Sequence, residues 1–277
     1  MNKNILKLKN AHIHDEDIEF YPKYHKYVVK SDPDSTYTSV TTWVNNHFPK
    51  FDANNVIEKI MNGSNWKPGN KYWGMTAEEI KKSWDQNRNS AANKGTNLHE
   101  NIECFMNNKQ LKDVSYTHAD LLKAESTINN DSVEWQYFLN FIKDTPDMKP
   151  YRTEWNVFDK KTKISGSIDM VYENPDGTLS IYDWKRTKEL PKTNAYEVAI
   201  NPIIGNMPDT KFWHYTIQLN TYRHILQRNY GKVVTKLCLV RLSPETDNYE
   251  LLDIDMLDLK MGELFDEREK QLKNNNV

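Results

Sequence analysis

Residues 166–185 read Gly-Ser-Ile-Asp-Met-Val-Tyr-Glu-Asn-Pro-Asp-Gly-Thr-Leu-Ser-Ile-Tyr-Asp-Trp-Lys. Two short runs rich in β-forming residues flank the sequence Asn174-Pro175-Asp176-Gly177, so this segment predicts a β-hairpin. Asparagine, proline and glycine at the first, second and fourth positions suit a type I turn closed by a glycine bulge. We expect the other elements to assemble around this hairpin.

The turn also sets the register of the two strands. If Asn174 lies opposite Thr178, then Asp169 lies opposite Asp183, with Cβ atoms about 4.5–5.5 Å apart. Lys185 follows Asp183 by two residues and therefore points to the same face of the strand. The sequence thus predicts two carboxylates and one ammonium group on a single face.

Opposed carboxylates repel each other unless a cation lies between them or one takes a proton. A hard divalent cation such as Mg²⁺ prefers oxygen ligands and needs only a few of them from the protein. The alternative is an exposed hairpin in which Lys185 neutralises two surface acids. These three residues alone leave both interpretations open.

Composition narrows the class of protein. The chain of 277 residues has a net charge of −2, which argues against a protein that coats nucleic acid non-specifically but leaves room for a local basic groove. No apolar run approaches the roughly 20 residues of a membrane helix, and the N-terminus lacks a signal-peptide pattern. Cys104 and Cys238 are too few for a disulfide framework. We expect an intracellular protein of the cytoplasm, or of a nucleus or viral replication site, without membrane association.

Helical and extended patterns alternate along the rest of the chain. Residues 18–30 predict a β-ribbon, residues 54–62 and 76–94 predict helices, and a further helix begins near Lys94. Residues 194–210 form either an ordered loop or a mobile flap. Further helices are expected within 116–144, 211–228 and 257–273, and further strands at 151–158, 232–242 and 249–255.

Two groups of polar and aromatic residues allow a structural and a functional interpretation. Ser39 and Thr41 stand where helix caps belong, and they either cap only or hold a phosphate together with the helix N-terminus. Trp66, Tyr72 and Trp73 lie in one loop, where they either join a core or stack on unpaired bases.

Several short motifs follow one another in a fixed order. They are Gly95-Thr96, His99 with Glu103, Glu154, Gly166 to Asp169, Asp183-Trp184-Lys185, and Gln218 with Tyr222. Each is common by chance, but the ordered set resembles the RecB-like branch of the PD-(D/E)xK nuclease superfamily, most closely the mitochondrial genome-maintenance exonuclease type. The resemblance runs from about Ser39 to about Leu242.

The resemblance implies an α/β fold with a restriction-endonuclease-like core: a mixed central β-sheet flanked by helices, plus an N-terminal helical extension. We expect a single nuclease domain over residues 1–277. Residues 1–90 would form its N-terminal ribbon and helical portion, and residues 91–277 its catalytic core.

The resemblance also implies roles for individual residues. One or two Mg²⁺ or Mn²⁺ ions would be held by His99, Asp169, Asp183 and the backbone carbonyl of Trp184. Lys185 would orient or deprotonate the attacking water. Gln218 and Tyr222 would position the Lys185 region or the DNA backbone, and Glu154 would support the site. Contacts to nucleic acid are expected from Ser39, Thr41, Thr96, Arg186 and Lys188.

Two departures from the family pattern bear on these expectations. Ile168, rather than proline, precedes Asp169, which the RecB-like branch tolerates. The cysteine set that anchors an iron–sulfur cluster in some relatives is missing from the sequence, so we expect no iron–sulfur cluster.

The function expected from the sequence is a metal-dependent DNA nuclease, an exonuclease acting on DNA ends or single strands in replication, recombination or repair. One alternative is a structure-specific or RNA-directed endonuclease with the same site. Another is a nucleic-acid-binding protein on the same scaffold without turnover. The presence of Asp169, Asp183, Lys185 and Gln218 together favours an enzyme, because a degenerate site usually loses at least one such group.

Overall fold

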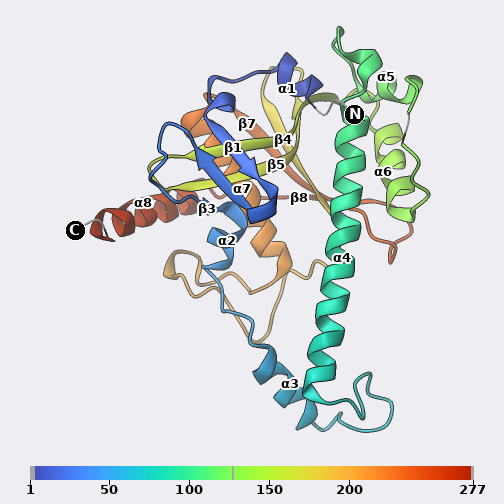
Figure 1. Cartoon of the computed structure of the whole chain (residues 1–277), viewed down its shortest axis with the longest axis vertical. Coiled ribbons are helices and arrows are strands. Elements are labelled where there is room, and N and C mark those ends of the chain that lie inside the picture. The colour runs from blue at the N-terminus through green and yellow to red at the C-terminus, as the bar shows by residue number, and fades with distance from the viewer. Residues whose placement is uncertain (1–3, 127, 276–277) are drawn as a thin grey trace. The chain divides into compact units, whose positions relative to one another are not determined.

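The computed structural model describes residues 4–126 and 128–275. The chain divides into two compact units: unit 1 takes the residues up to Pro49 and those from His99 onward, and unit 2 is Lys50–Leu98. Helix α4 (Ala77–Met106) begins in unit 2 and ends in unit 1 (Figure 1).

Unit 1 contains all the strands and most of the helices within the described residues. Unit 2 contains α3 (Ala53–Met61) and the first part of α4. The other elements of unit 1, in chain order, are α1 (Ile5–Lys9), β1 (Ile18–Tyr21), β2 (Lys26–Val29), β3 (Thr38–Ser39), α2 (Val40–Asn45), α5 (His118–Lys123), α6 (Val133–Asp144), β4 (Lys149–Asp159), β5 (Ile164–Glu173), β6 (Leu179–Lys185), α7 (Lys211–Asn229), β7 (Val234–Arg241), β8 (Glu250–Asp253) and α8 (Asp258–Asn275).

The main sheet is mixed, as the sequence predicts. Its strand order is β3-β5-β6-β7-β8, and β4 pairs with β5 outside this path. Strand β5 is antiparallel to β4 and β6, and β8 is antiparallel to β7. The pairs β3–β5 and β6–β7 are parallel. A separate ribbon of β1 and β2 confirms the pattern predicted for residues 18–30.

The central hairpin has the predicted turn and register. The Asn174 amide donates to the Thr178 carbonyl at 2.8 Å, and the Gly177 amide donates to the Asn174 carbonyl at 2.9 Å. Gly177 has φ +80°, a left-handed conformation that glycine adopts without steric cost. The β5–β6 ladder then runs back from this turn as far as the pair Met170 and Tyr182.

Helices cover both faces of the sheet. Helices α7, α2 and α8 join a hydrophobic core with one face, to which Ile181 and Leu239 belong. On the other face, Trp184 contacts Phe138 and Phe141 of α6, with ring centroids 5.6 Å apart in both pairs. Alternate residues of β6 therefore serve opposite layers, and the prediction of a mixed sheet flanked by helices is confirmed.

One predicted boundary is wrong. The sequence analysis ends a helix at residue 94 and begins another near Lys94, whereas α4 runs without interruption from Ala77 to Met106. A glycine inside a helix costs only about 1 kcal/mol relative to alanine, so Gly95 weakens α4 without ending it. None of the helices within residues 4–126 and 128–275 combines the length and the apolar character needed to cross a membrane.

A buried ion pair attaches the N-terminal segment to strand β4. Arg152 Nη1 lies 2.8 Å from Asp15 Oδ2, and both side chains are less than 5% exposed. The Trp155 indole also donates to Asp15, at 3.0 Å. Burial alone would raise the pKa of Asp15, but the hydrogen bonds from Arg152, from the His12 amide and from Trp155 outweigh burial and lower it.

Replacing Asp15 with Asn is expected to lower the free energy of unfolding by about 3–5 kcal/mol at neutral pH, because Arg152 stays buried without a counter-charge. An aspartate whose pKa is lowered by folding stabilises the folded state at pH values above its unfolded pKa of about 3.9. That contribution is lost as the pH falls through the pKa of the folded state. The difference between wild type and D15N should therefore shrink below about pH 4. Urea unfolding of both proteins at neutral pH and below about pH 4 measures this difference in the free energy of unfolding. An equal difference at the two pH values would contradict the assignment of Asp15 as the partner of Arg152.

Candidate active site

Three acidic residues lie side by side on neighbouring strands. The β4–β5 register places Glu154 across from Asp169, and continuation of the β5–β6 register places Asp169 across from Asp183. The row of carboxylates therefore runs from β4 through β5 to β6. The continued register is the one that the turn at Asn174 predicts.

The site lies where β5 and β6 separate. Backbone pairing between these strands stops at Met170 and Tyr182. Beyond that point the Trp184 amide donates to Asp169 Oδ2 at 3.1 Å, so an acidic side chain takes the place of a backbone acceptor.

Glu154 has an unusual backbone conformation. Its φ of +43° lies in the left-handed region, which is rarely adopted by a residue with a long side chain and costs on the order of 1–3 kcal/mol. Ser167 Oγ donates to Glu154 Oε2 at 2.9 Å and holds the carboxylate. Strain of this kind persists where the surrounding structure fixes a side chain in one direction.

His99 joins the acids from the last part of α4. His99 Nε2 lies 3.0 Å from the Trp184 carbonyl oxygen, an arrangement in which Nε2–H donates to the carbonyl. Nδ1 lies 3.5 Å from Asp169 Oδ2 and 3.9 Å from Glu154 Oε1. One donor atom from each of these three residues lies within 4.8 Å of the others, which is a spacing suited to a metal ion.

Lys185 projects into the same site and is mostly buried. Its Nζ lies 2.6 Å from Asp183 Oδ2, with the lysine side chain 15% exposed. Burial would lower the pKa of Lys185, but the negative charges of Asp183 and Asp169 outweigh burial and raise it. Lys185 is therefore charged at neutral pH in the protein without metal.

Burial raises the pKa values of Glu154 and Asp183. Burial raises the pKa of Glu154, and the negative charge of Asp169 adds to the effect. Burial also raises the pKa of Asp183, with Lys185 opposing the shift and Asp169 reinforcing it. The three neighbouring carboxylates face the ammonium group of Lys185, and their combined charge exceeds it, so the site favours additional positive charge.

A divalent cation fits this donor set. Carboxylate oxygens are the ligands that Mg²⁺ and Mn²⁺ prefer, and the imidazole nitrogen of His99 adds a donor that is common at transition-metal sites. Asp183 Oδ2 is buried and, among the described residues, accepts no hydrogen bond of good geometry. The charge that this oxygen meets is the Lys185 ammonium group at 2.6 Å, and a bound ion would add to or replace that charge.

Gln218 and Tyr222 lie one turn apart on α7. Tyr222 is 3% exposed, and Gln218, which is half-buried, forms a hydrogen bond with its hydroxyl group. A Cβ atom at Gly166 would lie 2.9 Å from the Tyr222 ring, so only glycine allows this close approach. Tyr222 is thus packed beneath β5, while Gln218 retains partial exposure.

Three of the predicted nucleic-acid contacts lie outside the cluster of acids. Ser39 caps α2: its hydroxyl accepts from the Thr42 amide at 3.1 Å. This is the capping role that the sequence offered as one alternative. Thr41 is exposed in the first turn of α2, and Thr96 is exposed on the unit 2 part of α4.

The two predicted basic contacts after β6 are engaged within the protein. Arg186 Nε lies 2.6 Å from Glu134 Oε1, and both side chains are largely buried. Lys188 is exposed and lies 3.8 Å from Glu245. An exposed pair of this length contributes little, so Lys188 is the more accessible of the two for a phosphate.

Sequence reasoning missed Tyr215. Its ring centroid lies 4.5 Å from Lys185 Nζ, a cation–π geometry. The sequence analysis did not single out this residue, which precedes Tyr222 by seven positions, only about 20° short of two full helical turns. That spacing is the signal that could have identified it.

Replacing Tyr215 with Leu is expected to lower the cleavage rate by roughly 3- to 30-fold at saturating substrate, because the aromatic face that holds Lys185 is lost. Tyr215→Phe keeps the face and should retain most of the activity. Steady-state cleavage of labelled DNA by both variants tests this, with the Michaelis constant expected to change little. Equal losses in the two variants would show that the hydroxyl, or packing alone, matters instead.

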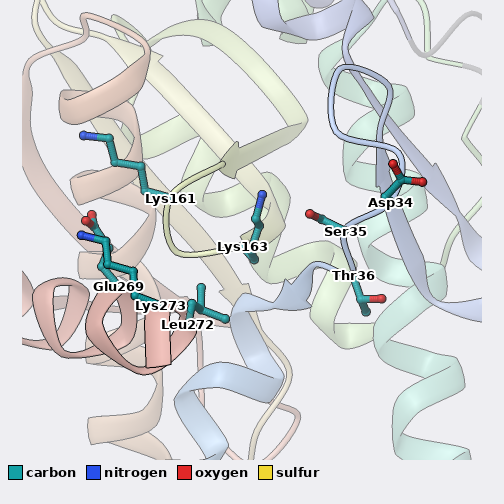
Figure 2. Close-up of a pocket in the computed structure, with 8 residues that line it drawn as sticks. All are labelled: Asp34, Ser35, Thr36, Lys161, Lys163, Glu269, Leu272 and Lys273. Carbon is teal, nitrogen blue, oxygen red and sulfur yellow. The ribbon is translucent and has the colours of Figure 1, made fainter. Parts of the chain in front are cut away.

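A cavity elsewhere in unit 1 lacks these features. It measures about 580 Å³ and lies between residues 34–36, the β4–β5 turn and α8. Figure 2 shows its mixture of lysines and acids. Two of these charges already have partners: Lys163 pairs with Asp32, and Glu269 pairs with Arg228. None of the predicted site residues lines it.

Comparisons with known proteins agree with this geometry at the level of the family. A model of the PD-(D/E)XK nuclease superfamily matches residues 76–274. No curated protein matches the chain.

Two solved structures resemble parts of the chain. An exonuclease candidate from Eubacterium rectale is 14% identical, with 44% of this chain and 43% of that chain covered and a TM-score of 0.28. SSO0001 is 16% identical, with 42% of this chain and 48% of that chain covered and a TM-score of 0.24. The chain therefore spans less than half the length of either protein, and similarity this low adds nothing about its function.

The family match covers more than two thirds of the chain, from α4 through α8. Within it lie His99, the row of three acids, and the Asp-Trp-Lys sequence at the end of β6. The chain belongs to the PD-(D/E)XK nuclease superfamily.

Proposed function

We propose that the protein is a Mg²⁺- or Mn²⁺-dependent deoxyribonuclease of the RecB-like type that hydrolyses phosphodiester bonds at DNA ends or in single strands. Membership of a nuclease superfamily supports nucleic acid as the substrate. The observation that carries the proposal is the row of Glu154, Asp169 and Asp183 beside His99 and Lys185.

The proposed ligands are Asp169, Asp183, His99 and the Trp184 carbonyl, with Glu154 beside them. A bound divalent ion supplies charge neutralisation at the phosphate and lowers the pKa of a bound water toward neutrality. His99 lies among these groups, with Nε2 3.0 Å from the Trp184 carbonyl oxygen and Nδ1 3.5 Å from Asp169 Oδ2. Glu154 is close enough to be a ligand itself rather than only a support.

Lys185 is the proposed contact to the reacting groups. Its ammonium group can hold the attacking water or a phosphate oxygen, and it is confined by Asp183 on one side and the Tyr215 ring on the other. Gln218 and Tyr222 support it from α7. Ser39, Thr41, Thr96, Arg186 and Lys188 remain proposed DNA contacts, of which Arg186 would have to exchange Glu134 for a phosphate.

The direct test is cleavage of end-labelled single- and double-stranded DNA and RNA by the purified protein. We expect cleavage of DNA with Mg²⁺ or Mn²⁺ and a complete loss of cleavage with EDTA, because the acids then lack the ion that activates water. Activity that survives EDTA and extensive dialysis would contradict the proposal.

The same assay separates an exonuclease from an endonuclease. A circular single strand has no ends, so an exonuclease should leave it intact while degrading the linear form. Cleavage of the circle at a comparable rate would favour the endonuclease alternative.

A further inference from the structure

Unit 2 contains a cavity of its own, of about 560 Å³, which lies within the size range of small-ligand sites. Aromatic and charged side chains dominate its lining. The lining residues are Phe51, Ala53, Lys81, Trp84, Asp85 and Arg88.

The two aromatic side chains differ in how they are held. The Trp84 indole donates to the Tyr72 hydroxyl at 2.9 Å and is therefore fixed. Phe51 is 73% exposed, and its ring centroid lies 6.0 Å from that of Trp84 at an angle of 50°. The next residue, Asp52, caps α3 through the Asn54 amide, so the backbone at Phe51 is anchored while its ring stays open to solvent.

The two cations lie beside these rings. Lys81 and Arg88 stand about one helical turn on either side of Trp84 on α4, so all three share a face. Arg88 pairs with Asp85 at 2.9 Å, but both side chains are more than half exposed, and such a pair is easily exchanged.

Unit 2 is also positively charged in a chain that is acidic overall. It contains eight lysines and arginines against five aspartates and glutamates, whereas the whole chain has 37 against 39. It carries three of the eight tryptophans in 49 residues. Exposed aromatic rings together with excess positive charge are typical of surfaces that bind single-stranded nucleic acid.

We propose that this cavity binds an unpaired nucleotide of a single DNA strand, with the base stacked on Phe51 and the adjacent phosphates held by Lys81 and Arg88. Only an unpaired strand offers a free base face to such a ring. The inference rests on the proposed deoxyribonuclease function for its choice of DNA, and it specifies a second place where that substrate is held. Asp85 weakens the attraction, so Asp85→Asn is expected to tighten binding.

The experiment measures the affinity of the full chain for a short fluorescein-labelled oligothymidylate by anisotropy, in EDTA so that no cleavage occurs. Phe51→Ala is expected to weaken binding by about 5- to 100-fold, as for the loss of one base–aromatic stack. Phe51→Trp keeps an aromatic face and should bind the oligonucleotide about as tightly as wild type. Circular dichroism of each variant checks that the helices persist.

Charge is tested with a matched pair of lysines. Lys81→Ala should weaken binding and reduce the slope of log affinity against log salt by about 0.7, as for one phosphate contact to a single strand. The neighbouring Lys82 is exposed but does not line the cavity, so Lys82→Ala should have a smaller effect. Equal effects of the two variants, unchanged affinity in Phe51→Ala, or equal affinity for a duplex would overturn the proposal.

These outcomes are independent of cleavage. If wild type binds the oligonucleotide through Phe51 but does not hydrolyse it with Mg²⁺ or Mn²⁺, the proposed function fails while the binding site stands. If hydrolysis occurs and Phe51→Ala binds as tightly as wild type, the binding site fails while the proposed function stands.

Discussion

Asp183→Asn is expected to reduce DNA cleavage by at least about 1,000-fold, which corresponds to the loss of about 4 kcal/mol of transition-state stabilisation. Asparagine keeps the shape of the side chain but offers a neutral amide where the site needs a charged oxygen. Single-turnover cleavage with Mg²⁺ measures the loss. Asp253→Asn is a suitable control, because Asp253 lies on β8, is largely exposed and pairs with Lys236.

The same substitution should leave the fold intact. In the protein without metal, burial and the charge of Asp169 raise the pKa of Asp183. The charged form of Asp183 is therefore disfavoured by burial and by repulsion from Asp169. Removing that charge is not expected to lower the melting temperature, because Asp169 still offsets the charge of Lys185 after its closest partner is lost. Wild type should be stabilised by added Mn²⁺ and Asp183→Asn should not, because binding to the folded state alone raises stability. Full activity in D183N would remove Asp183 from the proposed site.

The position of the acids on β5 and β6 could be predicted because the information is local. The turn at Asn174–Gly177 fixes the register, and the two-residue period of a strand then fixes which side chains share a face. Asp169, Asp183 and Lys185 follow from these two rules. The strand pairing observed between Met170 and Tyr182 is the register that they require.

Contacts between distant segments could not be predicted in the same way. Glu154 reaches the row of acids through a left-handed backbone conformation that no rule for a regular strand anticipates. Arg186 looks like a free phosphate contact in the sequence, but α6 supplies Glu134 to pair with it. In both cases the tertiary arrangement decides the environment of the residue.

The path of α4 shows the limit of local propensity. Gly95 predicts a boundary, yet α4 continues through it because the hydrophobic positions Leu98 and Ile102 bury the helix further on. Tertiary packing outweighs a local penalty of about 1 kcal/mol. His99 keeps its predicted place near the acids, since its position depends on this later, buried portion.

Lys185→Ala is expected to reduce cleavage by about 100- to 1,000-fold, the range found when one preorganised donor to a developing charge is removed. The loss should appear in the rate at saturating DNA rather than in affinity, because one ammonium group is a small part of the DNA-binding surface. Lys236→Ala provides the control on the neighbouring strand β7, where the lysine pairs with the exposed Asp253.

Metal-dependent stability distinguishes the role of Lys185 from that of Asp183. Without Lys185, the buried Asp183 carboxylate loses the ammonium group 2.6 Å away that offsets its charge, so the metal-free variant should melt at a lower temperature than wild type. Added Mn²⁺ should then stabilise Lys185→Ala at least as much as wild type, whereas it should not stabilise Asp183→Asn. If Mn²⁺ stabilises neither variant, Lys185 is needed to build the metal site and cannot be assigned to the reacting water or phosphate alone.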